Sequence, residues 1–344
     1  MYRLRDWRRH LAACLVVISL SFPSPGQKER GQTPANRDDE PIKLGTTLVQ
    51  VPATVSEPGG RYVTDLSKDD FSIFEDGVKQ RIEFFGTVEQ PFSVALLLDS
   101  SGSTAAQVEQ IKSAALAFVD RMRSRDRAMV ISFNDSVQVQ CELTGDSETL
   151  RRAVASITPG EFTQVFEAVY TAVWEKLQDV EGRKAVIVFT DGIDNASSEI
   201  SEEDTLDAVI ESEDIIVYPI RYSTRLDVER KMEARIRSSL AAKGNDAVLE
   251  EVARSRREVD RTYRKADEYL DQLARMSGGV VERADTMQDL SGAFTRIAEE
   301  LRRQYLLGYY PTTRAKDARD RKITVEVLRP GMKVRARPAY RATQ

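Results

Sequence analysis

Histidine and cysteine are almost absent from this chain of 344 residues. The single histidine is His10, and the two cysteines are Cys14 and Cys141. His10 and Cys14 lie in an N-terminal segment with the features of a cleaved signal, so the exported chain would keep one cysteine and no histidine. These absences exclude Ser-His-Asp and Cys-His catalysis, histidine-ligated zinc and an intramolecular disulfide bond in the exported chain.

An excess of positive charge and a phosphate-binding loop are also missing. The chain has 50 Lys plus Arg against 55 Asp plus Glu, a net charge of −5. Removing residues 1–26, which hold four Arg and one Asp, leaves 46 basic and 54 acidic residues and a net charge of −8. A protein this acidic is a poor general nucleic-acid binder, so we expect no nucleic-acid partner. The phosphate-binding pattern G-x-x-x-x-G-K-[ST] does not occur.

The N-terminus predicts export. Residues 1–10 are basic, residues 11–22 form a short apolar run, and small or turn-forming residues follow up to Gly26. This order is typical of a signal peptide over residues 1–26, and the run is too short for a permanent membrane span. An uncleaved N-terminal anchor is the alternative. Residues 27–43 are polar and predict a flexible linker, so we expect a periplasmic, cell-envelope or extracellular protein with no membrane span in its mature part.

Short alternating runs at both ends of the remaining chain predict β-strands. The N-terminal part (44–90) and the C-terminal part (303–344) each contain too few strands to bury both faces of a sheet. We therefore expect the two parts to form the two halves of one small β-sandwich. Its strands are expected at 47–51, 71–74, 304–310, 322–328 and 333–337.

Between these parts, residues 91–302 alternate strand and helix patterns. The apolar runs 92–98, 185–189 and 215–220 predict strands buried on both faces. The alternation favours a doubly wound, mostly parallel α/β sheet, which would be inserted into the sandwich. Further strands are expected at 128–133, 137–141 and 279–282, and helices at 108–122, 165–177 and 290–301.

A charged segment at 225–265 interrupts this alternation. It contains twelve Lys or Arg against eight Asp or Glu, and Val228, Met232 and Ile236 recur every four residues. This narrow apolar stripe predicts a helical hairpin. We interpret it as a solvated helix pair on the domain surface. The alternative is that it lines or covers a site, because ligands of parallel sheets bind beyond the carboxyl ends of the strands.

Two carboxylates and three hydroxyls are expected to meet at that edge of the sheet. Asp99, Ser101 and Ser103 follow the strand 92–98, Thr163 lies at the start of the helix 165–177, and Asp191 follows the strand 185–189. The five residues are Asp99, Ser101, Ser103, Thr163 and Asp191. Such an oxygen set suits Mg²⁺, with Mn²⁺ and Ca²⁺ as alternatives, whereas capping of helices by Asp and Ser is the purely structural explanation. Neutral hydroxyls leave a metal electrophilic, so an acidic side chain from outside can complete its coordination.

The order D-x-S-x-S, distant Thr, then Asp resembles the metal-ion-dependent adhesion site (MIDAS) of von Willebrand factor type A (vWA) domains. The stretches GEFTQVFEAVYTAV around Thr163 and VIVFTDGIDN around Asp191 are similar to that family, and the resemblance covers about 91–302. It implies a Rossmann-like vWA domain in which Ser101, Ser103 and Thr163 ligate the metal directly, and Asp99 and Asp191 directly or through water. The flanks DDFSIFEDGVKQRIEFF, YLLGYYP and RPGMKVRARPAY resemble the bacterial secreted "VWFA-related" proteins.

Three functions follow from these patterns. The first is a non-enzymatic binding or adhesion module whose metal accepts an Asp or Glu carboxylate from a partner protein. The second is a structural scaffold of an envelope assembly, in which the metal only stabilises the loops. A metal-assisted phosphohydrolase is disfavoured because no positioned base, second metal set or phosphate clamp is visible. Asp194 and Asn195 are expected to shape the turn after Asp191, and Cys141 to be an inert core thiol.

Overall fold

A mixed six-stranded sheet forms the centre of the protein. The computed structural model describes residues 48–86, 90–243, 245–284, 286–312 and 319–341, so the predicted signal peptide (1–26) and linker (27–43) lie outside the described residues. The strand order is β10-β9-β8-β5-β6-β7, and all neighbours are parallel except β6 and β7. The strands are β5 (Phe92–Asp99), β6 (Arg127–Phe133), β7 (Val137–Thr144), β8 (Arg183–Thr190), β9 (Ile215–Arg221) and β10 (Glu282–Arg283).

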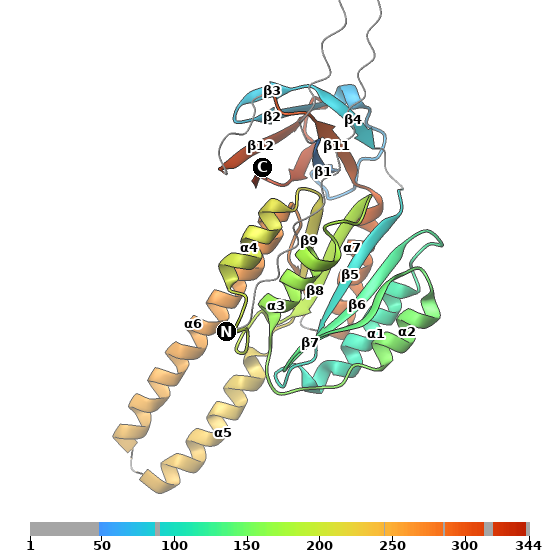
Figure 1. Ribbon diagram of the computed structural model, residues 1–344. Coiled ribbons are helices and arrows are strands. Elements are labelled where there is room, and N and C mark those ends of the chain that lie inside the picture. Colours follow the sequence, from blue (N-terminus) through green and yellow to red (C-terminus); the bar gives the residue numbers. More distant parts are fainter. Residues whose placement is uncertain (1–47, 87–89, 244, 285, 313–318, 342–344) are drawn as a thin grey trace, which may run out of the picture. The chain divides into compact units, whose positions relative to one another are not determined.

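Helices cover both faces of this sheet, as Figure 1 shows. Alternate residues of β5 point to opposite faces. Val94 and Leu96 pack in one hydrophobic cluster with α1, α2 and α7, whose bounds are Val108–Val119, Ser147–Ala155 and Met287–Arg302. Ala95 and Leu97 pack in a second cluster with α3 (Val165–Tyr170), α4 (Glu202–Glu211) and α6 (Asn245–Ser277). Every residue of β5 and β8 is buried, which explains why both strands are mostly apolar.

The structure differs from the sequence prediction at two element boundaries. The expected single helix at 165–177 is α3 followed by a π-helical turn, η3 (Thr171–Lys176), in which the N–H of Leu177 bonds to the carbonyl of Ala172. The expected strand 279–282 is shorter, because Gly278 has φ +83° and Gly279 donates its N–H to Ala274 of α6 (2.8 Å). These glycines end α6, so β10 begins only at Glu282.

Strands from both chain ends form two further antiparallel sheets, as expected for the sandwich. Their strand orders are β13-β1-β11-β4 and β14-β12-β2-β3, and residues of both sheets share one hydrophobic core. Inside it, Glu75 accepts hydrogen bonds from Tyr309 (2.8 Å) and Tyr340 (2.9 Å) and pairs with Arg321 (3.3 Å). The strands are β1 (Val49–Ser56), β2 (Phe71–Glu75), β3 (Val78–Gln80), β4 (Ile82–Gly86), β11 (Tyr305–Tyr309), β12 (Asp320–Val327), β13 (Lys333–Ala336) and β14 (Ala339–Arg341).

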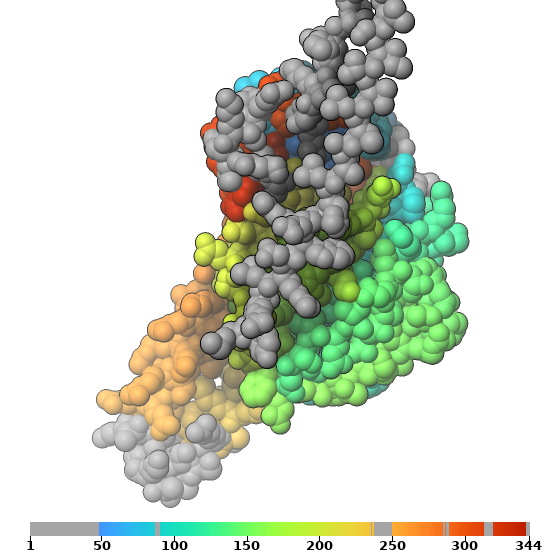
Figure 2. All heavy atoms as spheres, viewed as in Figure 1, coloured from blue at the N-terminus to red at the C-terminus, as the bar shows by residue number. Residues whose placement is uncertain are grey.

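The charged segment forms the helical hairpin that its periodicity predicts. Its helices are α5 (Arg225–Lys243) and the first part of α6. In the space-filling view, the described part of the hairpin extends beyond the body of the domain (Figure 2). The second helix is longer than expected, because its last turns bury Leu270 and Leu273 against the sheet. Within the described ranges, every helix is too short or too polar to cross a lipid bilayer.

Candidate metal centre

The two acidic residues of the predicted metal site lie at the carboxyl ends of adjacent strands. Asp99 is the last residue of β5, and Asp191 directly follows β8. These strands are parallel neighbours with Leu98 opposite Phe189, so both ends reach the same edge of the sheet. Both carboxyl side chains are buried. The fold therefore brings the two carboxylates together, as the sequence predicts.

Hydrogen bonds fix the orientation of Asp99. Its Oδ1 accepts the N–H of Ser101 (3.0 Å), and its Oδ2 accepts the hydroxyl of Thr190 (2.7 Å). The hydroxyl of Thr104 also lies within reach of Oδ1 (3.3 Å). These donors leave the carboxylate little rotational freedom.

Asp191 is held from a different direction. Its Oδ1 accepts the N–H of Ile193 (3.1 Å), and its Oδ2 accepts the hydroxyl of Thr224 (2.7 Å). The hydroxyl of Thr224 also lies 2.7 Å from the hydroxyl of Tyr263 on α6. The hairpin therefore contacts the site. Its interpretation as a solvated helix pair on the domain surface does not account for this contact.

The paired carboxylates create an unfavourable concentration of negative charge in a buried place. Burial, and then the neighbouring carboxylate of Asp191, raise the pKa of Asp99 to about 7. Burial also raises the pKa of Asp191, although hydrogen bonds from Thr224 and Ile193 oppose the shift. A cation between the two groups would relieve both effects.

The serine hydroxyls lie beside the carboxylates. Ser101 Oγ and Ser103 Oγ are 3.1 Å apart, and the Ser103 hydroxyl is close enough to Asp191 to lower the pKa of that carboxyl. Gly102 lies between the two serines. A Cβ atom on Gly102 would lie only 3.0 Å from the carbonyl oxygen of Glu161, so this loop packs directly against the loop that leads to Thr163.

Thr163 is fixed by the turn after Asp191. Its N–H donates to Asn195 Oδ1 (2.8 Å), and the Asn195 N–H donates back to the Thr163 carbonyl (3.2 Å). Within the part of the chain that the structure describes, Thr163 is a buried residue whose hydroxyl keeps some solvent contact and makes no hydrogen bond. The expected turn-shaping role is also visible at Asp194, which accepts the N–H of Phe166 at the start of α3 (3.2 Å). All three loops of the predicted site are thus in contact.

The donor set fits a hard divalent cation. The described residues contain no group of three or more His, Cys, Asp or Glu side chains suited to a metal. The site instead combines two carboxylates with three hydroxyls, one of which is uncommitted. All of these donors are oxygens, which Mg²⁺ and Ca²⁺ prefer, and Mg²⁺ readily keeps water in its remaining positions. When bound, such an ion would act as an electrophile at this edge of the sheet.

Four residues with contacts to the site, Thr104, Thr190, Thr224 and Tyr263, were absent from the sequence prediction. Thr190 could have been noticed as the polar end of an apolar strand. Thr224 and Tyr263 carry no such signal, because the closure of the hairpin decides whether they meet Asp191.

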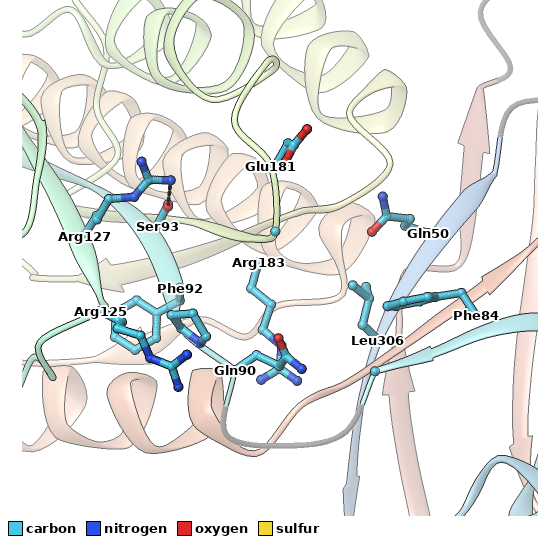
Figure 3. Close-up of a pocket in the computed structure, with 13 residues that line it drawn as sticks. Gln50, Phe84, Gln90, Phe92, Ser93, Arg125, Arg127, Glu181, Arg183 and Leu306 are labelled. Carbon is cyan, nitrogen blue, oxygen red and sulfur yellow. Dashed lines mark hydrogen bonds between the residues drawn. The ribbon is translucent and has the colours of Figure 1, made fainter.

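A separate cavity lies at the opposite edge of the sheet. It has a volume of about 310 Å³, and its lining includes the first residues of β5 and β8, Phe92 and Arg183. Figure 3 shows Arg125, Arg127 and Arg183 around it. Because it lies at the amino ends of these parallel strands, the cavity is distinct from the candidate metal centre.

Comparison with known proteins agrees with this architecture. The family model described as the von Willebrand factor type A domain matches residues 93–275, more than half of the chain. The uncharacterized protein sll0103 of Synechocystis sp. is 29% identical over 106 residues, covering 30% of this chain and 25% of that protein. The chain thus matches about a quarter of the length of this relative.

Several solved structures are similar at low sequence identity. Proximal thread matrix protein 1 of the mussel byssus is 16% identical with a TM-score of 0.46, covering 66% of this chain and 51% of its own. The von Willebrand factor type A protein of Catenulispora acidiphila is 10% identical with a TM-score of 0.46, covering 85% of this chain and 73% of its own. The vWF domain of the pilus tip protein Mfa5 of Porphyromonas gingivalis is 12% identical with a TM-score of 0.43, covering 62% of this chain and 95% of its own. Family membership rests on the match over residues 93–275: the chain belongs to the von Willebrand factor type A domain family.

Proposed function

We propose that this protein is an exported, non-enzymatic adhesion module that binds a partner protein through a divalent metal. The five residues of the candidate centre would hold the metal, for which Mg²⁺ is the first choice. An Asp or Glu side chain of the partner would complete its coordination. These five residues are Asp99, Ser101, Ser103, Thr163 and Asp191. The proposal of export rests on the basic and apolar residues 1–26.

The observation that carries the proposal is the composition of the centre. Two carboxylates balance the charge of a divalent ion, but three of the five side chains are neutral hydroxyls. An open position on such an ion attracts a further anionic oxygen, because carboxylate is a preferred ligand of hard cations. The described residues offer no third carboxylate in a metal-binding group, so an external one fits that position.

The rim of the centre supports protein recognition. Phe162, next to Thr163, is 51% exposed, although the Asp135 carboxylate accepts the N–H groups of Glu161 (2.9 Å) and Phe162 (2.7 Å) and thereby fixes the loop. Leu226, two residues after Thr224, is 66% exposed. Large exposed apolar side chains on a fixed backbone are typical anchors of protein interfaces. A partner with an apolar residue beside its acidic one would therefore gain additional contact.

Selection of short random peptides on the purified protein tests this function. We expect Mg²⁺ to enrich peptides that share an Asp or Glu, a chelator to elute them, and Asp99→Ala to abolish their binding. Phe162→Ser should weaken binding, whereas Leu328→Ser should not, because Leu328 is similarly exposed (63%) but lies just beyond β12 in the sandwich. If chelation lowers the melting temperature but no carboxylate-dependent peptide is enriched, the metal serves as a structural stabiliser and the scaffold alternative replaces this proposal.

A further inference from the structure

A chain of hydrogen bonds joins the hairpin to the candidate metal centre. Thr224 Oγ1 lies 2.7 Å from Asp191 Oδ2 and 2.7 Å from the hydroxyl of Tyr263. Thr224 immediately precedes α5, and Tyr263 lies on α6, so the chain involves both arms of the hairpin. Both residues are buried, with exposed fractions of 1% for Thr224 and 4% for Tyr263.

The number of available protons gives this chain a direction. A carboxylate that holds a metal only accepts hydrogen bonds, so the single hydroxyl proton of Thr224 must point to Asp191. The hydroxyl of Tyr263 must then donate to Thr224. Each bond polarises the next one, so the tyrosine strengthens the bond between Thr224 and the carboxylate.

The hydroxyl of Thr224 bonds to a residue of the candidate metal centre and does not cap its own helix. The N–H groups of Asp227 (3.0 Å) and Val228 (3.1 Å) bond to the carbonyl of Thr224, which places this residue at the start of α5. A threonine there commonly accepts a hydrogen bond from the first turn of its own helix. In the described structure, its side chain bonds to Asp191 and Tyr263 instead.

Close packing adds a second connection, between the site and the part of α6 that continues from the hairpin. Gly192, the residue after Asp191, has φ +78°, and a Cβ atom on it would lie 3.0 Å from the Leu270 side chain and 3.1 Å from the Ala266 carbonyl oxygen. The site-bearing loop therefore rests directly on α6. A shift of α6 would displace this loop as well as the hydrogen-bond chain.

We propose that Thr224 and Tyr263 are positioning residues that couple the hairpin to the metal affinity of the centre. Thr224 orients Asp191, and Tyr263 acts through Thr224. Because coupling between two sites is reciprocal, metal binding should order the start of α5, and a partner that grips the hairpin should change the metal affinity. This inference rests on the metal site of the proposed function but not on the recognition of an acidic partner.

Titration of the purified protein with Mn²⁺, followed by the electron paramagnetic resonance signal of the free ion, measures the coupling. Thr224→Val should weaken binding about tenfold or more, as is usual for loss of a group that orients a metal ligand. Thr224→Ser keeps the hydroxyl and should restore most of the affinity. Tyr263→Phe removes one oxygen and should weaken binding about two- to tenfold.

Tyr269 provides a matched control on the same helix. Its hydroxyl also pairs with a threonine, Thr205 (3.1 Å), and its side chain is also buried, but it has no hydrogen bond to the metal centre. Tyr269→Phe should therefore leave the Mn²⁺ affinity unchanged while lowering the melting temperature of the metal-free protein about as much as Tyr263→Phe. Wild-type affinity in Thr224→Val and Tyr263→Phe, or an equal loss in Tyr269→Phe, would overturn the coupling.

Hydrogen exchange measured by mass spectrometry tests the reverse direction. Mg²⁺ should slow exchange in the first turn of α5 in the wild type and in Tyr269→Phe, but not in Thr224→Val. A wild type that binds no metal overturns the coupling together with the metal centre. A coupled metal site that enriches no acidic peptide leaves this inference standing and removes only the proposed partner recognition.

Discussion

At the scale of single residues, Asp99 and Asp191 are kept together at a cost to the metal-free protein. Burial and mutual repulsion raise the pKa of Asp99 from an ordinary value of 3.8 to about 7. Because its pKa is higher in the folded than in the unfolded state, Asp99 contributes to the stability of the folded protein at low pH. This contribution is complete below the unfolded-state pKa and is lost as the pH rises through about 7. Metal binding would offset the loss, because the ion favours the ionised form.

Asp99→Asn separates these two effects. At about pH 8, metal-free Asp99→Asn should melt a few degrees above the metal-free wild type, because the neutral amide removes the repulsion between Asp99 and Asp191. The difference in melting temperature should become smaller towards about pH 5, where Asp99 of the wild type is protonated. Addition of Mg²⁺ should stabilise only the wild type. Scanning calorimetry of metal-stripped protein measures both effects, and a variant that is less stable than the wild type at about pH 8 contradicts the prediction.

The convergence of the loops that carry the five predicted site residues could be expected from sequence, because each residue occupies a fixed place relative to a strand end or a helix start; that these residues bind a metal stays a prediction. Asp99 follows an apolar strand, and a parallel neighbour brings Asp191 beside it. Thr224 and Tyr263 could not be predicted in the same way. Their contact with the centre depends on how the arms of a hairpin close across a separation of 39 residues, which no local pattern encodes.

At the scale of elements, the strands were more predictable than the helices. Largely apolar runs identify β5, β8 and β9, because burial on both faces favours apolar residues at successive positions and leaves the polar residues mostly near the strand ends. The helices α2 and α4 carry a weaker sequence signal, because they begin at the caps Asp146 and Ser201 but contain few apolar residues. The end of α6 was also missed, because the contact of Tyr269 and Leu270 with the sheet extends this helix beyond the charged segment.

The contact between the Asp191 loop and α6 leads to a prediction about two glycines. Gly192 and Gly182 both have positive φ angles, +78° and +89°, but a Cβ atom would meet Leu270 at Gly192 and nothing within 4 Å at Gly182. Gly182→Ala should lower the free energy of unfolding by about 1 kcal/mol through backbone strain alone. Gly192→Ala should lower it by about 1–3 kcal/mol more, because α6 must also move.

Urea unfolding of the metal-free proteins measures this difference, and the absence of metal prevents changes in metal affinity from contributing. Equal losses in the two variants would show that α6 yields without cost. In that case close packing would not transmit a shift of the hairpin, and the hydrogen bonds of Thr224 would have to carry the coupling alone.

At the scale of the whole described chain, buried arginines bridge the region where the sandwich strands meet the vWA domain. Arg337, between β13 and β14, donates to three carbonyls at the end of α4: Val209 (3.2 Å), Ile210 (2.9 Å) and Ser212 (2.8 Å). Arg183, at the start of β8, similarly donates to Leu301 (3.2 Å) and Gln304 (2.6 Å), where α7 leads into β11. These contacts satisfy helix ends that would otherwise be buried without partners.

We therefore expect Arg337 to determine whether the described chain unfolds as one unit. Its pKa is lowered to about 10 by burial, so it remains charged near neutral pH. Arg337→Met would leave the carbonyls of α4 unsatisfied and should lower the free energy of unfolding by about 3 kcal/mol or more. We expect one calorimetric transition in the wild type and two in Arg337→Met, because the sandwich then loses its hydrogen bonds to α4 and melts first.

Arg61→Met serves as the control for this prediction. The side chain of Arg61 is 77% exposed and, among the described residues, its ion pair is with Glu57 in the turn after β1, so its loss should cost less than about 1 kcal/mol and leave a single transition. A single transition in Arg337→Met, shifted no further than that of Arg61→Met, would show that the hydrophobic cores alone maintain cooperativity. Two transitions would mean that the sandwich can separate from the domain while the metal centre stays folded, because all five residues of the centre lie between β5 and the end of the Asp191 turn.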